Sequence, residues 1–302
     1  MTTTEWVAVD WGTSNLRAWG IGADGGQTFA VASDKGMGKL TQPEFPGVLD
    51  ALIAERFDGA TDVVICGMAG ARQGWMEAPY IETPADLTAL LHRAVNPTGA
   101  AANLCPRILP GVCQRTVGQE DVMRGEETQL LGLLHLRPGF DGTVVLPGTH
   151  SKWVELRGGR IVRFQSAMTG EFYEILSQHS VLRHSFAGDP NGPETEAGVA
   201  EGLAAGLDHP ELLSSLAFRT RSALLLSKKG TDWCSGYLSG LLVGTEIGVP
   251  RGWLQNVQAV PLIGSARFGR LYGAALTQIG VESFALDATD ATIAGLKAAR
   301  AQ

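Results

Sequence analysis

Two Gly-Thr turns are the parts of this sequence whose residue types suit phosphate chemistry. They read Gly12-Thr13-Ser14-Asn15 and Gly148-Thr149-His150-Ser151, and each lies between two apolar segments. A turn of this composition gathers backbone N–H groups and hydroxyls at one point, and such fixed donors bind phosphate oxygens. Because two turns of this kind can grip one ligand, the sequence predicts a polyphosphate site.

The charged side chains differ between the two turns. Asp10 stands two residues before the first turn, whereas Leu146 occupies the equivalent position before the second. Only the first turn therefore offers a carboxylate for a hard cation that bridges phosphate oxygens. Further donors to phosphate at the two turns are Thr13, Asn15, Arg17 and Lys152. His150 has two alternatives, donation to phosphate or completion of the hydrogen bonds of its own loop.

A third turn, Gly264-Ser265-Ala266-Arg267, follows an apolar segment over 257–262 and precedes a predicted helix over 270–278. Because a helix N-terminus gathers unpaired N–H groups, a strand, a glycine turn and a helix in this order favour an anion or nucleotide site. The sequence therefore predicts nucleotide contacts from Gly264 and Ser265.

The turns must be held by strands, and the sequence predicts two copies of one supersecondary unit. Residues 5–34 have the pattern of a three-strand antiparallel meander with glycine turns. The same order of apolar strand, small polar turn, second strand and Gly-Gly hairpin returns over 143–164, with the two turns 136 residues apart. This repetition indicates a duplicated β-structure, with a chance likeness of two hairpins as the alternative.

Further elements are expected around the two copies. A buried strand is predicted over 62–70, and Asp121 has the residue type of a helix N-cap. Helices are expected over 46–56, 84–93, 121–136, 193–227, 237–247 and 288–301. The mixture of strands and helices predicts an α/β protein, and the Arg137-Pro138-Gly139 turn marks a domain boundary.

Length and composition limit the class of protein. A chain of 302 residues is long enough to form two domains with a cleft between them. With 44% hydrophobic and 18% charged residues, the chain is globular rather than disordered. Its net charge of −7 does not favour binding to nucleic acid or to an anionic membrane, both of which require a basic surface.

The cysteines and the apolar segments bear on location. Cys66, Cys105, Cys113 and Cys234 have no C-x-x-C spacing, so free thiols in a reducing cytoplasm are expected. No basic start followed by an apolar run marks a secretory signal, and no apolar segment approaches the roughly 18 to 20 residues of a membrane span. We therefore expect a cytoplasmic protein.

Four segments in order along the chain resemble the 2-dehydro-3-deoxygalactonokinase family of the sugar kinase, actin and Hsp70 superfamily. These segments are 10–17, 121–129, 146–153 and 264–267, and the resemblance runs nearly end to end. It implies an actin-like ATPase (ribonuclease H-like) fold with duplicated mixed five-stranded sheets, and two phosphate loops followed by an adenosine loop. It also implies ATP-dependent phosphorylation of the C6 hydroxyl of 2-dehydro-3-deoxy-D-galactonate, with ATP and Mg²⁺ bound, in galactonate catabolism.

The resemblance further implies a carboxylate at the start of the helix before the second phosphate loop, where it accepts the proton of the attacking hydroxyl. Asp121, Glu126 and Glu127 are the alternatives. Glu126 is favoured because it follows Gly125 in a Gly-acid turn like that of related kinases, and Asp121 ranks second. Many relatives have Asp where this turn has Glu. A structural alternative treats both glutamates as solvated helix charges.

The carboxylate of a sugar acid needs donors of its own. The segment 69–75 offers a cation, an amide and an aromatic ring after the buried strand, so Arg72, Gly74 and Trp75 are the predicted substrate contacts. Arg124 and Arg267 are rival cations, which could touch phosphate or stack on adenine instead. A surface arginine beside a packing tryptophan is the alternative for this segment.

Together these expectations define two lobes. Residues 1–141 are expected to bind the sugar acid and to carry the first phosphate loop, and residues 142–302 are expected to bind the nucleotide. The terminal helix could cross back to the first lobe. An exopolyphosphatase-like phosphohydrolase, a kinase of another 2-keto-3-deoxy sugar acid and a filament-forming or chaperone-like ATPase are the alternatives. The oligomeric state is open, with a homodimer among the alternatives.

Overall fold

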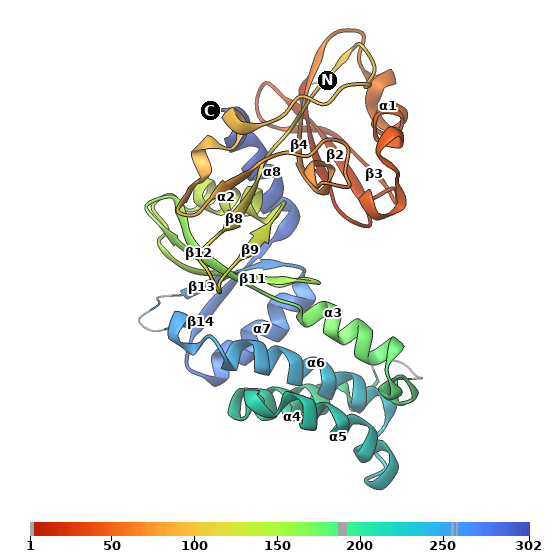
Figure 1. The fold of residues 1–302 in the computed structure, drawn as a ribbon, viewed down its shortest axis with the longest axis vertical. Coiled ribbons are helices and arrows are strands. Elements are labelled where there is room, and N and C mark those ends of the chain that lie inside the picture. Colours follow the sequence, from red (N-terminus) through yellow and green to blue (C-terminus); the bar gives the residue numbers. More distant parts are fainter. Residues whose placement is uncertain (1–2, 187–191, 255–256, 258) are drawn as a thin grey trace. The chain divides into compact units, whose positions relative to one another are not determined.

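The computed structural model describes residues 3–186, 192–254, 257 and 259–302, and these fall into two compact units (Figure 1). The first unit comprises residues 1–141, 156–164 and 288–302, and the second comprises 142–155 and 165–287. The sequence prediction placed all of 142–302 in one lobe. The segment 156–164 differs from that prediction, since its contacts are made within the first unit. The segment 288–302 also belongs to the first unit, in agreement with the expectation that the terminal helix could cross back.

The first unit is built on a five-stranded sheet in the order β3-β2-β1-β4-β7. Its strands are β1 (Thr4–Trp11), β2 (Leu16–Gly22), β3 (Gln27–Ser33), β4 (Thr61–Gly67) and β7 (Leu104–Ile108). The first three strands form the predicted antiparallel meander, and β4 and β7 continue the sheet in parallel. Helix α1 (Phe45–Ile53) buries Phe45, Leu49 and Ile53 in the same core as the apolar side chains of β1 and β4.

A second sheet has the order β14-β13-β10-β11-β12-β6. Its strands are β6 (Ala85–Asp86), β10 (Gly142–Leu146), β11 (Ser151–Arg157), β12 (Arg160–Ala167), β13 (Ala259–Gly264) and β14 (Glu282–Asp287). Read from β12 to β14, five of these strands follow the same chain order as the strands of the first sheet read from β3 to β7. The predicted duplication is therefore present in the topology. The boundary between the two units falls within β11 and β12.

The sixth strand of this sheet corrects the prediction of a helix over 84–93. Ala85 and Asp86 pair antiparallel with Ile161 and Arg160 of β12. The Asp86 carboxylate then accepts a hydrogen bond from the Thr88 backbone N–H, and two short 3₁₀ turns follow over 87–89 and 91–93. Apolar spacing alone could not reveal this pairing, because the partner strand lies about 75 residues away in sequence.

The first unit also contains a small sheet of β5 (Tyr80–Glu82), β8 (Gly111–Gln114) and β9 (Asp121–Met123), followed by helix α2 (Glu126–Leu136). The helix starts five residues later than predicted, because 121–123 pair with β8 instead of beginning a helix. Helix α8 (Ala288–Arg300) packs on α2, and Gly132 and Gly295 lie where the two backbones meet. A Cβ at either glycine would collide with a backbone carbonyl of the facing helix.

Helices dominate the second unit: α3 (Thr169–Glu174), α4 (Thr195–Asp208), α5 (Leu213–Leu226), α6 (Thr231–Gly248) and α7 (Ala266–Gln278). Helices α4 and α6 lie side by side in Figure 1 and make the most extensive helix contact of the unit. Glycines spaced four apart line this contact, Gly198, Gly202 and Gly206 on α4 and Gly236, Gly240 and Gly244 on α6.

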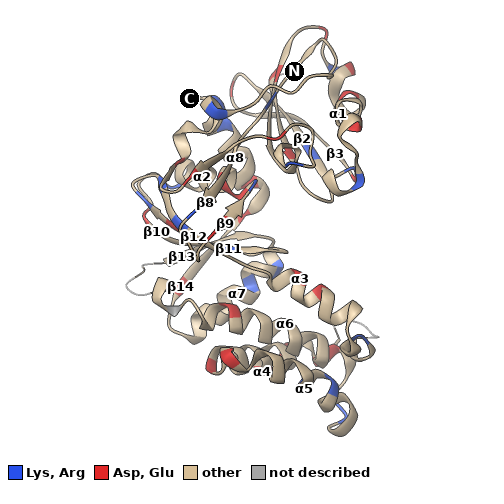
Figure 2. Ribbon diagram, viewed as in Figure 1, with Lys and Arg blue, Asp and Glu red and all other residues tan. Residues whose placement is uncertain are grey.

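Charged residues are spread along both units. Figure 2 shows acidic and basic residues interspersed over the described part of the chain, in keeping with a modest net charge of −7. Within the described residues, no helix combines the length and the apolar character needed to cross a membrane.

Candidate active site

The predicted first phosphate loop, residues 12–15, joins β1 to β2, and backbone hydrogen bonds from residues 37 and 38 hold its carbonyl groups. The Met37 N–H donates to the Gly12 carbonyl at 3.0 Å, and the Gly38 N–H donates to the Thr13 carbonyl at 2.9 Å. Gly36 lies so close that a Cβ there would stand 2.5 Å from the Asn15 nitrogen. Because the loop is fixed through its carbonyls, the Thr13 and Asn15 side chains remain exposed.

Asp10 lies near the end of β1, beside Arg17 on β2 and Cys66 on β4. Burial raises the pKa of the Asp10 carboxyl, the Arg17 charge opposes that shift, and the Glu126 charge adds to it. Asp10 and Glu126 are thus electrostatic neighbours. Among the described residues no group of three or more His, Cys, Asp and Glu side chains could hold a metal ion. Mg²⁺ in phosphoryl-transfer sites usually takes one or two carboxylates together with phosphate oxygens and waters, so Asp10 fits that role.

Glu126 is the first residue of α2, and two glycines bring it beside the end of β4. Gly125 has φ +110° and Gly67 has φ +89°, a backbone region that disfavours side chains. A Cβ on Gly125 would lie 3.4 Å from the Gly67 Cα. The Glu126 carboxylate accepts a hydrogen bond from the Arg124 N–H at 3.1 Å and remains partly exposed. This proximity of α2 to β4 accounts for the coupling of Glu126 to Asp10.

Glu127 has a different environment from its neighbour. Its side chain is buried, and both carboxylate oxygens accept from the Gly125 N–H, at 2.9 and 2.7 Å. Burial raises the pKa of Glu127 to about 8, and the charge of Glu126 adds to the shift. The buried Glu127 carboxylate therefore accepts the hydrogen bond of the backbone N–H group just before α2. The expectation that both glutamates are solvated does not hold for this one.

Asp121 lies in β9, not at the start of α2. It pairs with Gln114 of β8, and its carboxylate accepts a hydrogen bond from the Val122 N–H at 2.7 Å. The expectation that Asp121 caps the helix is therefore wrong, because the strand and the 124–125 turn intervene before the first helical residue.

The segment predicted to bind substrate divides into exposed and buried residues. Arg72 is exposed after the end of β4, whereas Gly74 is buried. Trp75 is 5% exposed, its ring packs edge-on to Trp11, and its indole N–H donates to the Thr98 carbonyl at 3.1 Å. The Trp75 ring is therefore packed in the core, as the alternative of a packing tryptophan has it, and its contact with substrate stays a prediction.

Arg124, the rival cation of the first unit, is tied to the small sheet. Its Nη2 donates to the Ala78 carbonyl at 2.9 Å, and the guanidinium lies 4.4 Å from the Tyr80 ring centroid. Its Nε and Nη1 atoms are buried without a hydrogen-bond partner. A buried guanidinium with unpaired donors is costly unless a ligand or water completes it, so Arg124 is a serious alternative to Arg72.

The predicted second phosphate loop, residues 148–151, leads from β10 into the start of β11, and with the adjoining Lys152 it contains both exposed and buried residues. Thr149 and His150 are exposed, and the His150 Nε2 forms a short contact with the Glu171 carboxylate. Ser151 is fully buried and Lys152 is 5% exposed, with its Nζ donating to the Ser166 hydroxyl. Both side chains therefore have an internal partner, and their role as phosphate donors stays a prediction.

A buried carboxylate that the sequence did not single out lies behind this loop. Glu246 on α6 is 8% exposed and accepts from Trp153 Nε1 at 2.8 Å, from the Tyr272 hydroxyl at 2.6 Å and from the Thr169 hydroxyl. The Ser151 and Tyr272 hydroxyls are 2.9 Å apart. Burial raises the pKa of Glu246, and the three donors oppose that shift. The donors come from residues 26 to 93 positions away in sequence, and no sequence signal marks them.

Gly264 and Ser265 lie at the carboxyl end of β13, next to the second phosphate loop. A Cβ on Gly264 would stand 3.5 Å from Pro147, and β10 and β13 run in parallel. Ser265 is the N-cap of α7, and its hydroxyl accepts from the Phe268 N–H at 3.4 Å. The carboxyl ends of adjacent parallel strands therefore bring both predicted nucleotide loops together.

Two of the cavities in the second unit have lining residues in common. One of 120 Å³ is lined in part by Thr169, Gly170 and Arg267, and Gly170 packs against the backbone of Gly148 and Thr149. The other, of 390 Å³, is enclosed by residues of α4, α6 and α7. Ser239, Arg267 and Leu271 line both. The cavities thus share a wall, and Arg267 belongs to it.

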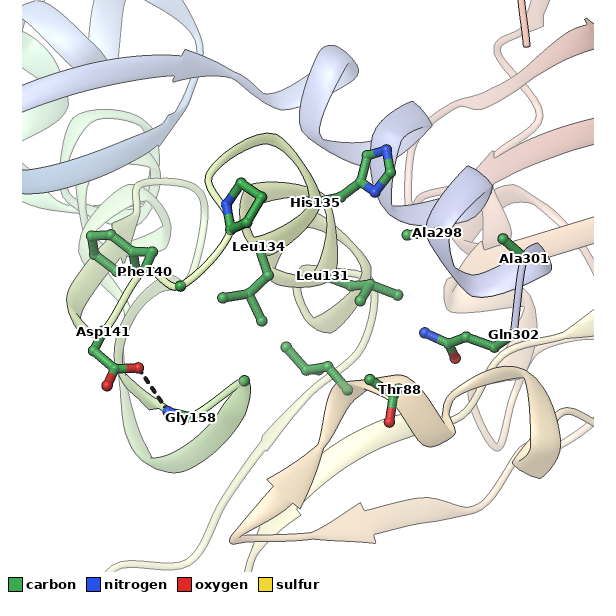
Figure 3. A pocket seen from close by; sticks show the side chains of 14 residues that line it. Thr88, Leu131, Leu134, His135, Phe140, Asp141, Gly158, Ala298, Ala301 and Gln302 are labelled. Carbon is green, nitrogen blue, oxygen red and sulfur yellow. Dashed lines mark hydrogen bonds between the residues drawn. The ribbon is translucent and has the colours of Figure 1, made fainter. Parts of the chain in front are cut away.

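A further cavity of 640 Å³ belongs to the first unit, between α2, α8 and the 138–141 turn (Figure 3). Leu131 and Leu134 from α2 face it, together with Ala298 from α8, and Asp141 accepts from the Gly158 N–H at 2.7 Å at its edge. Its described lining residues include none of the predicted site residues.

Comparison with known proteins adds to this geometry. A family model described as 2-keto-3-deoxy-galactonokinase matches residues 10–299. A Rhizobium meliloti (strain 1021) protein assigned as a 2-dehydro-3-deoxygalactonokinase is 41% identical, over 99% of this chain and 98% of its own. The 2-dehydro-3-deoxygalactonokinase of Escherichia coli (strain K12) is 32% identical, over 98% of this chain and 97% of its own.

Comparison with solved structures finds a relative with the same assigned activity and shows the fold. A crystal structure of a Sinorhizobium meliloti protein assigned as a 2-dehydro-3-deoxygalactonokinase has TM-score 0.89 at 40% identity and covers 98% of both chains. A xylulose kinase from Lactobacillus acidophilus has TM-score 0.52 at 9% identity, covering 97% of this chain and 88% of its own. An ADPNP-bound activator of 2-hydroxyisocaproyl-CoA dehydratase from Clostridium difficile also has TM-score 0.52, at 13% identity, covering 98% of this chain and 94% of its own. The predicted actin-like ATPase fold is confirmed.

Proposed function

This chain belongs to the 2-keto-3-deoxy-galactonokinase family, and on that basis we propose that it transfers the γ-phosphoryl group of ATP to the C6 hydroxyl of 2-dehydro-3-deoxy-D-galactonate. The observation that carries this proposal is the match of the family model to residues 10–299, which includes every predicted site residue. A reaction of this kind belongs to galactonate catabolism, and its need for ATP supports a cytoplasmic location.

In the proposed complex the second unit binds the nucleotide. The adenosine would occupy the 390 Å³ cavity beside α7, and the phosphates would extend past Gly170 to the second phosphate loop. Thr149 and His150 are the exposed side chains of that loop, and the Ser265-capped start of α7 adds free N–H groups. Arg267 is the cation on the shared wall of the two cavities, so it is the candidate for contact with ribose or phosphate.

The first unit supplies the acid–base group and the metal ligand. We assign Glu126 as the base that accepts the hydroxyl proton, because its carboxylate is partly exposed at a helix start, while Glu127 is buried. Asp10 would hold Mg²⁺, which when bound neutralises charge on the phosphate oxygens. Thr13 and Asn15 would donate to phosphate from the first loop, and Arg17 keeps part of the Asp10 charge compensated.

The substrate carboxylate requires a cation, and Arg72 remains the first candidate with Arg124 as its rival. Arg72 is exposed and free to form a bidentate contact, whereas Arg124 has two buried donors without partners. A site built around such a contact rejects neutral hexoses, because their binding would leave the cation unpaired. Galactose and glucose are therefore expected to be poor acceptors.

A coupled ADP-release assay across 2-keto-3-deoxy sugar acids tests the proposal. We expect the galactonate-derived acid to be the best acceptor, with the gluconate-derived C4 epimer and galactose as comparisons. Preference for the epimer would replace the substrate and leave the kinase reaction in place. Phosphate release that is equally fast without any sugar acid would instead support the exopolyphosphatase-like phosphohydrolase and overturn the kinase.

A further inference from the structure

We infer that Glu246 is a positioning residue for the second phosphate loop, holding residues 148–151 and the start of α3 in the arrangement that receives nucleotide phosphates. Glu246 lies on α6, far from the loop in sequence, and its carboxylate interacts with buried side chains behind the loop, the Ser151 hydroxyl among them. The inference rests on the proposed use of ATP. It concerns phosphate binding and not the identity of the sugar.

One arm of the network runs from Glu246 to the loop through hydroxyl groups. An ionised carboxylate can only accept, so the Tyr272 proton points to Glu246, at 2.6 Å. The Tyr272 oxygen is then free to accept from Ser151, at 2.9 Å. The Ser151 oxygen in turn accepts from the Gly148 N–H, at 3.5 Å. These hydroxyl groups thus connect the Glu246 carboxylate on α6 with Gly148, the first residue of the loop.

The other arm reaches the loop through α3. The Thr169 hydroxyl donates to the Glu246 oxygen that Tyr272 also contacts, and Thr169 is the first residue of α3. The Glu171 N–H donates to the Thr149 carbonyl at 3.1 Å. A Cβ on Gly170 would stand 2.6 Å from the Gly148 carbonyl, so α3 begins directly against the loop. Glu246 therefore fixes the loop from two sides.

Trp153, on strand β11 after the loop, makes a third contact with Glu246. Its indole N–H donates to the second Glu246 oxygen at 2.8 Å. Each of these donors is buried or partly buried, and an unpaired buried donor destabilises the folded arrangement. Loss of the carboxylate would therefore disturb β11, α3 and α7 together, which are the elements that carry or contact the phosphate loop.

Affinities for ADP and for adenosine separate this role from general stability. Adenosine shares the base and ribose with ADP but lacks the phosphates. We expect Glu246→Gln to weaken ADP binding by about tenfold or more in calorimetry, while adenosine affinity, measured by competition with ADP, stays within about twofold. Tyr272→Phe removes one donor to Glu246 and the contact of the same hydroxyl with Ser151, while the other donors to Glu246 remain, so a smaller loss of ADP affinity is expected from it. It also serves as the deciding variant if Glu246→Gln does not fold.

Glu201→Gln is the matched control. Glu201 on α4 also accepts from an indole N–H, that of Trp233 at 3.1 Å, but it lies in an ion-pair cluster with Arg219 and Lys229. We expect no change in the ratio of ADP to adenosine affinity in this variant. An unchanged ratio in both Glu246→Gln and Tyr272→Phe would overturn the inference. If the ratio falls as expected while no sugar acid is phosphorylated, the proposed sugar-acid kinase reaction fails and the positioning role stands.

Discussion

Asp10, Glu126 and Glu127 are three carboxyl groups of one neighbourhood with three different surroundings. Asp10 sits within a strand beside Arg17, Glu126 is partly exposed at a helix start, and Glu127 is buried beneath the same turn. Because the three carboxyl groups differ in burial and in hydrogen-bond partners, they can take separate roles. Three variants distinguish those roles.

Asp10→Asn tests the metal ligand. We expect turnover to fall by about two to three orders of magnitude, since losing a charge that acts in the transition state costs roughly 3 to 4 kcal/mol. The measurement is magnesium-dependent ADP release, with thermal melting as the check on folding. A folded variant with near-native turnover would rule out the role.

Glu126→Gln and Asp121→Asn test the base. Removal of a general base typically slows the chemical step about 10² to 10⁴-fold with little change in melting, so that result is expected for Glu126→Gln. Asp121 lies in a strand of the small sheet, and we expect its variant to keep most of the activity. Steady-state kinetics and melting of both variants give the comparison, and the reverse pattern would transfer the base to Asp121.

Glu127→Gln tests the buried carboxyl through stability. The folded pKa of about 8 is above the ordinary value of 4.5, so the folded protein holds this proton more tightly than the unfolded chain. The contribution of Glu127 to stability is therefore complete below about pH 4.5 and is lost as the pH rises toward 8, by at most about 1.4 kcal/mol per pH unit.

The measurement is the unfolding free energy of both proteins from pH 5 to pH 8 without added metal. We expect the native protein to lose stability relative to Glu127→Gln as the pH increases. A difference between the two proteins that stays constant over this range would show that Glu127 does not hold its proton in the folded state.

At the scale of elements, helix packing depends on glycines at positions that admit no side chain. On α4 and α6 the glycines recur every four residues, on the faces that meet. A Cβ on Gly202 would collide with the Tyr237 carbonyl and stand 2.7 Å from the Leu241 nitrogen. The close approach of these helices also sets the walls of the 390 Å³ cavity, since both contribute to its lining.

Gly202→Ala tests this packing, with Gly47→Ala as the matched control. Overpacking of a closed helix contact typically costs about 1 to 3 kcal/mol, and we expect that loss for Gly202→Ala. Gly47 lies in α1 with open space around its Cα, so alanine there should leave stability unchanged or raise it by up to about 1 kcal/mol. Chemical denaturation measures both, and equal effects would remove the packing argument.

At the scale of the whole molecule, the end of the chain completes the unit with which it began. Helix α8 packs on α2 and also contacts β1 and β4. Arg300 pairs with Glu5 at 3.1 Å and with Asp62 at 3.3 Å. The first unit, which carries Asp10 and Glu126, is therefore incomplete until the last helix has been added.

A chain shortened after Asp287 tests this dependence. The deletion removes Ile293 and Leu296, which are 5% and 0% exposed, and burial of two such side chains contributes roughly 3 to 6 kcal/mol. We expect a large fall in melting temperature and in soluble yield. A chain shortened after Arg300 loses only exposed residues and should melt like the full chain. Equal melting of the two shortened chains would contradict the prediction.

The sequence by itself determined the features that short segments encode. The Gly-Thr turns and the repeated meander depend on neighbouring residues, so local composition and period revealed them. The helix after the third turn is also predicted, although α7 begins at Ala266, four residues before the predicted start. The four-residue glycine spacing of α4 and α6 is equally local, but it indicates close packing only once the two helices are known to meet. The family could also be identified from the sequence, because four motifs in a fixed order are far more specific than any one of them.

Tertiary structure decided the roles that depend on burial and on distant partners. Trp75 lies in the core because its ring packs on Trp11 and its indole N–H donates to the Thr98 carbonyl. Asp121 lies in a strand because it pairs with Gln114 of β8. Glu246 is identified only in the folded chain, where Trp153, Thr169 and Tyr272 donate hydrogen bonds to its carboxylate. Local sequence cannot specify such partners, because the free energy of a buried polar group depends on what the fold places around it.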